Sequence, residues 1–83
     1  MITVEVLYFA ATRDLAGTDR ERLELPPHVT TIAALGEHLE RLRPSLAGRL
    51  GSVRFARNEE FARNGDPLTD GDVVALIPPV AGG

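Results

Sequence analysis

A single helical pattern lies in the middle of the chain, and every other long regular segment has the pattern of a strand. Over residues 31–43, apolar side chains recur at intervals of three, four and three, which places on one stripe of a helix Ile32, Leu35, Leu39 and Leu42. A threonine precedes this helix as a cap, and the proline that follows ends it. Because a lone helix must bury its stripe against one face of a sheet, the pattern predicts an α+β fold.

Five short segments around this helix are predicted to form strands. They cover residues 1–10, 21–25, 52–57, 60–63 and 72–77. A short helical turn, ended by Gly17, is expected between the first two. The order of two strands, one main helix and three strands is that of a β-grasp domain. In this arrangement the first and last strands lie parallel at the centre of a mixed sheet, and the helix packs on one face.

The first strand alternates between a fully apolar face and a mixed face. Leu7 and Phe9 fall on the mixed face, which begins with polar residues. Two interpretations remain open for this pair. The side chains cap the sheet beneath the following loop, or they belong to a patch that binds a partner.

Composition excludes several classes of function. The 83 residues suffice for one domain, contain no cysteine and no lysine, and carry a net charge of −3. The lack of cysteine excludes a disulfide framework and a cysteine nucleophile. The negative charge argues against nucleic-acid binding through phosphate neutralisation. No apolar run approaches the roughly 20 residues of a membrane span, so we expect no membrane association and, by default, a cytoplasmic location.

No group of side chains has the spacing of a catalytic or metal site. Asp70 and Asp72 flank a glycine, but the other oxygen ligands of a calcium loop are missing, so we interpret the segment as a turn. Glu59 and Glu60 are neighbours that would point to opposite faces of a strand, which argues against an acid–base pair. We therefore expect a protein that is not an enzyme and binds no metal or cofactor. The C-terminal carboxylate is the distinctive group that remains.

The end of the chain differs from the rest. The last predicted strand runs into two prolines, and the chain finishes with Gly82 and Gly83. Prolines keep the backbone extended and glycines present no Cβ, so such a tail can enter a narrow slot. A frayed terminus or an expression scar is the other interpretation that Gly-Gly alone leaves open. We divide the chain into a β-grasp domain, residues 1–77, and an extended tail, residues 78–83.

Four segments resemble the small subunit of molybdopterin synthase, a family of ubiquitin-like sulfur carriers. They lie at residues 7–10, 13–17, 56–60 and 67–83, and so span nearly the whole chain. The specific part is Asp-Gly-Asp at 70–72 followed by Pro-Pro-Val-Ala-Gly-Gly at 78–83. Arg57 departs from the pattern, in which a valine is expected before the asparagine.

The resemblance implies a sulfur carrier for molybdenum cofactor biosynthesis. In this family an ATP-dependent, ubiquitin-activating-like adenylyltransferase adenylates the terminal carboxylate, and sulfur then converts it to a thiocarboxylate. Carried onto this chain, Gly83 donates sulfur to cyclic pyranopterin monophosphate when the tail enters the large subunit of molybdopterin synthase. A heterotetramer with that subunit is expected. The catalytic groups belong to the partner, and ATP is used by the activating enzyme.

The same resemblance and the predicted strand directions indicate a docking surface. If the first and last strands are parallel, Phe9 and Ile77 end on the same side, and Phe61 lies on a neighbouring strand. We expect the partners to bind this patch and the tail beside it, that is, Phe9, Phe61, Ile77, Pro78, Pro79, Val80, Ala81 and Gly82. The alternative for Phe61 is that it plugs the edge of the core.

Three other functions remain open. The chain carries sulfur for thiamine, cysteine or tRNA thiolation, or it is a ubiquitin-like modifier that is conjugated to proteins. It is otherwise a β-grasp binding module with an inert tail. The chemistry up to the acyl-adenylate is common to sulfur carriers and modifiers, so the tail cannot separate them.

Overall fold

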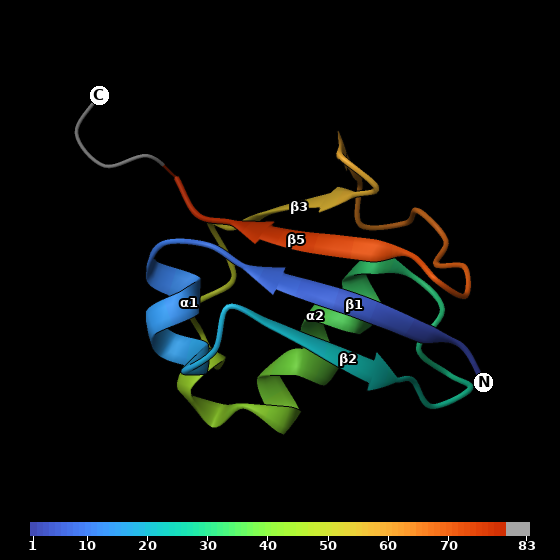
Figure 1. The fold of residues 1–83 in the computed structure, drawn as a ribbon, viewed down its shortest axis with the longest axis horizontal. Helices are drawn as coiled ribbons and strands as arrows, with labels where there is room; N and C mark the ends of the chain where they lie inside the picture. The colour runs from blue at the N-terminus through green and yellow to red at the C-terminus, as the bar shows by residue number, and fades with distance from the viewer. Residues whose placement is uncertain (80–83) are drawn as a thin grey trace.

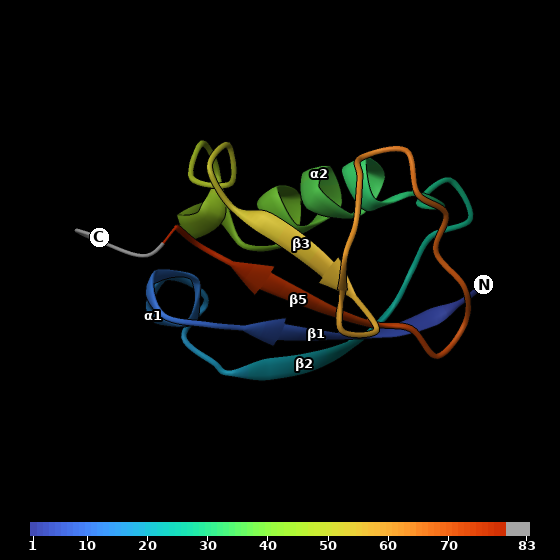
Figure 2. The same cartoon turned by 90° about the horizontal axis from the view of Figure 1, so that it is seen from above.

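A mixed sheet of five strands carries one long helix on one face (Figures 1 and 2). The computed structural model describes residues 1–79. In chain order its elements are β1 (Thr3–Tyr8), α1 (Ala11–Ala16), β2 (Arg20–Glu24), α2 (Ile32–Leu42), the 3₁₀ helix η1 (Pro44–Leu46), β3 (Arg54–Arg57), β4 (Glu60–Phe61) and β5 (Val73–Ile77). Among these elements, no helix has the length and apolar character needed to cross a membrane.

The strand order β2-β1-β5-β3-β4 confirms the predicted β-grasp fold. β1 and β5 pair in parallel, with Val6 opposite Val74, and the other three pairings are antiparallel. Figure 1 shows both central strands pointing toward the end of the sheet where α1 lies. The chain segments that follow β1 and β5 therefore start at the same end of the sheet, although they are far apart in the sequence.

The core lies between α2 and the facing side of the sheet. β1 and β5 alternate, and their inward set is fully buried together with three residues of the helical stripe: Val4, Val6, Tyr8, Val74, Leu76, Ile32, Leu35 and Leu39. Thr31 caps α2 as expected, because its Oγ1 accepts a hydrogen bond from the Ala34 amide at 3.2 Å. The prediction was wrong for Leu42, which is 50% exposed. The chain turns into η1 directly after it, and Leu46 of η1 is buried at that end of the core instead.

Several predicted boundaries were also too long or shifted. The first strand stops at Tyr8 because Ala10 has φ 49° and α1 begins at the next residue. The helical turn ends at Gly17, which adopts the left-handed conformation as predicted. The fourth strand, predicted over 60–63, is limited to Glu60 and Phe61. The second and third strands each begin or end one or two residues away from the predicted positions.

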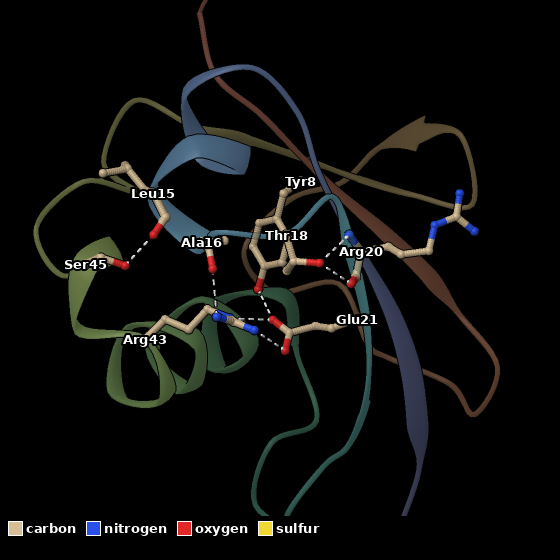
Figure 3. Close-up of polar contacts among 8 residues, drawn as sticks. All are labelled: Tyr8, Leu15, Ala16, Thr18, Arg20, Glu21, Arg43 and Ser45. Carbon is tan, nitrogen blue, oxygen red and sulfur yellow. Dashed lines mark hydrogen bonds and ion pairs between the residues drawn. The ribbon is translucent and has the colours of Figure 1, made fainter.

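A polar brace is formed by Tyr8 of β1, Glu21 of β2 and Arg43, which lies between α2 and η1 (Figure 3). Tyr8 donates its hydroxyl proton to Glu21, while Nε and Nη2 of Arg43 reach the two oxygens of that carboxylate at 2.8 Å each. Arg43 also donates to the carbonyl oxygen of Ala16 at 2.8 Å, which fixes the end of α1. Hydrogen bonds from Arg43 hold the pKa of Glu21 below its ordinary value, and burial followed by the bond to Glu21 raises the pKa of Tyr8. The sequence patterns gave no sign of this brace.

Candidate functional site: an apolar groove beside the root of the tail

The sheet face that points away from α2 carries an apolar groove. Strand residues alternate, so the side chains between the buried ones face outward. Leu7 of β1 pairs with Ala75 of β5, and Ala75 in turn lies opposite Ala56 of β3. The groove has a volume of about 240 Å³ and is lined by Leu7, Phe9, Ala56, Glu59, Phe61, Val73, Ala75 and Ile77. We call this set of residues the docking groove.

The structure brings together the three residues of the predicted apolar patch. Phe9, Phe61 and Ile77 all line the docking groove. Phe9 is 48% exposed and Phe61 is 60% exposed, so neither side chain is buried when the chain folds. The exposure of Phe61 argues against the alternative that it plugs the edge of the core. Their role in partner binding stays a prediction.

Phe61 stacks with Arg54, a residue that no sequence pattern indicated. The guanidinium carbon of Arg54 lies 4.0 Å from the centroid of the Phe61 ring, in cation–π geometry. Arg54 lies opposite Ile77 in the β3–β5 pairing, and Phe61 lies opposite Ala56. Arg54 and Ala56 share one face of β3, so the stacked pair lies over the outward face of the sheet.

The root of the tail is fixed by Thr12 of α1. Its side chain is 2% exposed, and its Oγ1 accepts a hydrogen bond from the Phe9 amide at 3.0 Å. The same hydroxyl lies 2.6 Å from the carbonyl oxygen of Phe9 and 3.3 Å from that of Leu76. Thr12 therefore joins the ends of the two central strands just before Pro78. A threonine that bonds back to the start of a short helix is a known local pattern, but the contact to Leu76 could not be read from the sequence.

The tight turn between β3 and β4 borders the groove and is anchored to β5. Asn58 Nδ2 donates to Asp72 at 2.9 Å, and Asn58 Oδ1 accepts from the Val73 amide at 2.9 Å. Burial alone would raise the pKa of Asp72. Hydrogen bonds from Asn58 and from the Thr69 amide, with the nearby Arg57, outweigh burial and hold that pKa below its ordinary value. Arg57, where the chain departs from the expected pattern, lies 3.6 Å from the carboxylate of Asp72.

The remaining predicted residues divide into two groups. Pro78 is half-buried and Pro79 is exposed, and both follow directly after β5. Val80, Ala81, Gly82 and Gly83 lie outside the described residues, so the predicted division at 77/78 stays a prediction. Asp70 and Asp72 belong to turns, in which Asp70 accepts a hydrogen bond from the Thr3 amide at 2.7 Å. Within residues 1–79, no three histidine, aspartate or glutamate side chains gather in the manner of a metal site.

Comparison with known proteins places this arrangement in a family. The family model described as the ThiS family matches residues 6–83. The molybdopterin synthase sulfur carrier subunit of Escherichia coli is 40% identical, over 96% of this chain and 99% of that protein.

Two solved structures share the fold closely. Small archaeal modifier protein 1 of H. volcanii superposes with a TM-score of 0.85 at 26% identity, over 96% of this chain and all of that one. One chain of the complex of subunits 1 and 2 of molybdopterin-converting factor from Helicobacter pylori has a TM-score of 0.70 at 26% identity, over 99% of this chain and all of that one. The chain therefore belongs to the ThiS family, and its full-length relatives confirm the resemblance to the small subunit of molybdopterin synthase.

Proposed function

We propose that this protein is the sulfur-carrier subunit of a molybdopterin synthase and that the carboxylate of Gly83 is the group that carries the sulfur. The observation that supports this most strongly is the similarity to the E. coli sulfur carrier subunit, which extends over almost the full length of both chains. The Pro-Pro-Val-Ala-Gly-Gly ending, which directly follows β5, agrees with this function.

The chemistry requires activation, because a carboxylate is a poor electrophile. In the proposed reaction, a carboxylate oxygen of Gly83 attacks the α-phosphorus of ATP on an adenylyltransferase and displaces pyrophosphate. A hydrosulfide ion then attacks the acyl carbon, the bond from that carbon to the AMP oxygen breaks, and loss of the sulfur-bound proton leaves a terminal thiocarboxylate. ATP is thus a substrate of the activating enzyme, and this chain binds no cofactor of its own. The activating enzyme consumes ATP, and this requirement favours a cytoplasmic site of action for the carrier.

The carrier contributes positioning, while the large subunit contributes the catalytic groups. Gly82 and Gly83 have no Cβ, so two different enzymes can enclose the same ending. Pro78 and Pro79 restrict the backbone and lower the entropy that is lost when the tail enters a slot. The docking groove lies beside the start of this tail and supplies an apolar surface for the partner. The complex of subunits 1 and 2 from H. pylori supports a large-subunit partner, and we propose that this chain forms a heterotetramer with that subunit.

A second function, conjugation to other proteins, is favoured by one specific observation. The modifier protein of H. volcanii superposes over the whole of its chain with a TM-score of 0.85. Isopeptide-linked products in cells would favour conjugation, whereas a free thiocarboxylate without conjugates would favour sulfur transfer. Sulfur transfer for thiamine, cysteine or tRNA thiolation would show the same thiocarboxylate, with a different acceptor.

Intact-mass spectrometry tests the proposal directly. The protein is incubated with the adenylyltransferase of the same organism, ATP and sulfide. We expect a mass gain equal to the exchange of one oxygen for one sulfur, located at the C-terminal residue. A variant that lacks Gly83 serves as the control and should gain nothing. An unchanged mass of the full chain, with an enzyme that activates another carrier in parallel, would contradict the proposal.

A further inference from the structure

Glu59 occupies a backbone conformation that suits glycine. The turn between β3 and β4 has two central residues, Asn58 with φ 51° and Glu59 with φ 72°. Such mirror-image hairpin turns favour asparagine followed by glycine, because positive φ crowds the Cβ of other residues. At Asn58 the cost of the positive φ is compensated, because its side chain forms hydrogen bonds with Asp72 and with the Val73 amide. Glu59 has no such compensation, because within residues 1–79 its carboxylate makes no hydrogen bond and no ion pair.

The strained residue lies at the rim of the docking groove. Glu59 is exposed, and it is the charged member of the groove lining, whose other members are apolar. Glu60, the next residue, is also exposed but is not part of the lining. One carboxylate of this pair therefore borders the groove while its neighbour does not. On the β3 side of the groove, the charge of Arg54 is stacked on Phe61.

A residue that is strained, and whose side chain makes no hydrogen bond or ion pair within residues 1–79, is a candidate for function. We infer that Glu59 is a specificity-determining residue of the docking groove. It receives a lysine or arginine of the large subunit, next to the apolar side chain that fills the groove. This inference rests on the proposed function, because it assumes that the large subunit binds this face. The choice of a cationic partner group follows from the negative charge at the rim, which takes part in no ion pair within residues 1–79.

Replacing Glu59 with glycine should raise the stability of the protein and weaken its binding to the large subunit. Glycine fits a φ of 72° without strain, so E59G should raise the denaturant midpoint of the full-length protein. The same change removes the carboxylate and should weaken binding of the large subunit. A merely structural residue would not show this opposition. Charges at the rim of an interface act mainly on the association rate and its salt dependence. The loss of affinity should therefore become smaller as the salt concentration rises.

The experiment compares three full-length variants with the wild type. E59Q removes the charge and keeps the size, E59G also removes the strain, and E60Q removes the neighbouring charge outside the groove. The dissociation constant and association rate for the large subunit of the same organism are measured at low and high salt. We expect E59Q and E59G to bind about two- to fivefold more weakly at low salt, with a flatter salt dependence. E60Q should bind like the wild type.

The outcomes separate this inference from the function on which it rests. If E59Q matches the wild type in affinity and salt dependence while the wild type binds, the role of Glu59 is overturned and the proposed function stands. If E60Q loses as much affinity as E59Q, the effect comes from the net charge of the protein, and the assignment of Glu59 is again overturned. If the wild type does not bind the large subunit, the proposed function is overturned and this inference with it. A lower denaturant midpoint for E59G would contradict the claim that Glu59 is strained.

Discussion

The two faces of the same sheet use neighbouring residues of the same strands for different purposes. Toward α2, Val6 and Leu76 are fully buried in the core. On the opposite face, Leu7 and Ile77 line an open groove, and Phe9 and Phe61 are about half exposed. Both faces are apolar at this end of the sheet, but only one is covered by a helix in the described part of the chain. In Figure 2, α2 lies on one side of the strands, and no helix of the described residues lies on the other side.

The covered face of the sheet contributes to folding, whereas the open face is available to a partner. The covered face removes apolar area from water within the chain, which stabilises the fold. The open face leaves apolar area exposed that a partner can cover, and contiguous exposed patches of this kind mark interaction sites. Stability and docking should therefore depend on alternate residues along β1 and β5. Four predictions can break or sharpen this distinction.

The largest effect is expected for the covered face. Leu76→Ala should destabilise the domain by about 3 kcal/mol, because it leaves a cavity in a closed core. Ile77→Ala, the next residue, should cost less than about 1 kcal/mol, since Ile77 faces the groove and is only partly buried. Chemical denaturation of the two variants measures both values. Equal losses would show that the open face also contributes to folding and would remove the distinction.

The next effect concerns docking. Phe61→Arg should weaken binding of the large subunit by about 2 kcal/mol, as for a central interface residue, while the isolated domain stays folded. Leu42→Arg is a matched control, because Leu42 is also an exposed apolar residue, at the end of α2. Titration calorimetry and circular dichroism provide the two readouts. Unfolding of the Phe61 variant, or an equal loss in the Leu42 variant, would refute the assignment of the groove.

The polar brace provides a pH-dependent test on the stability side. The pKa of Glu21 is lowered from 4.5, mainly by its hydrogen bonds from Arg43. Its stabilising contribution is therefore present above pH 4.5 and is lost as the pH falls through the lower folded-state pKa. Glu21→Gln should cost about 1.5 kcal/mol at pH 7, and the gap to the wild type should narrow in acid. Urea unfolding from pH 7 to pH 3 measures this difference, and a gap that does not change with pH would exclude the ion pair as its cause.

The smallest effect is expected where α2 lies closest to the sheet. A Cβ placed on Gly36 would lie 3.4 Å from Cζ of Phe55, which is a close but permissible contact. Gly36→Ala should gain helix propensity and stabilise the domain by about 0.5 kcal/mol, with part of the gain lost to crowding. Thermal unfolding detects a change of this size. A loss of stability instead would show that this helix–sheet contact requires glycine.

Alternation and local turn signals made most of the fold predictable. The positions of Val4, Val6 and Tyr8 identified the buried face of the first strand, and the single stripe of α2 required a sheet to cover it. The prediction that Leu42 is buried was wrong, because the apolar stripe continues in the sequence beyond the part of α2 that faces the core. Leu46 of η1 covers that end of the core instead. The helical period therefore located the helix without showing where its burial ends.

The candidate site was only partly predictable for a related reason. Phe9 and Ile77 follow from the parallel pairing of the central strands, which the element order indicated. The stacking of Arg54 on Phe61 and the positive φ of Glu59 depend on rotamers and turn geometry that no periodicity encodes. Thr12 contacts Leu76 across 64 positions of sequence, so only the folded chain reveals that it links the ends of β1 and β5.

The most direct test of the central claim follows the sulfur itself. The thiocarboxylated protein is mixed with the large subunit and cyclic pyranopterin monophosphate, and its intact mass is followed over time. Our account predicts that the mass returns to that of the ordinary carboxylate while a dithiolene appears on the pterin. A thiocarboxylate that persists beside a large subunit active with another carrier would contradict the account.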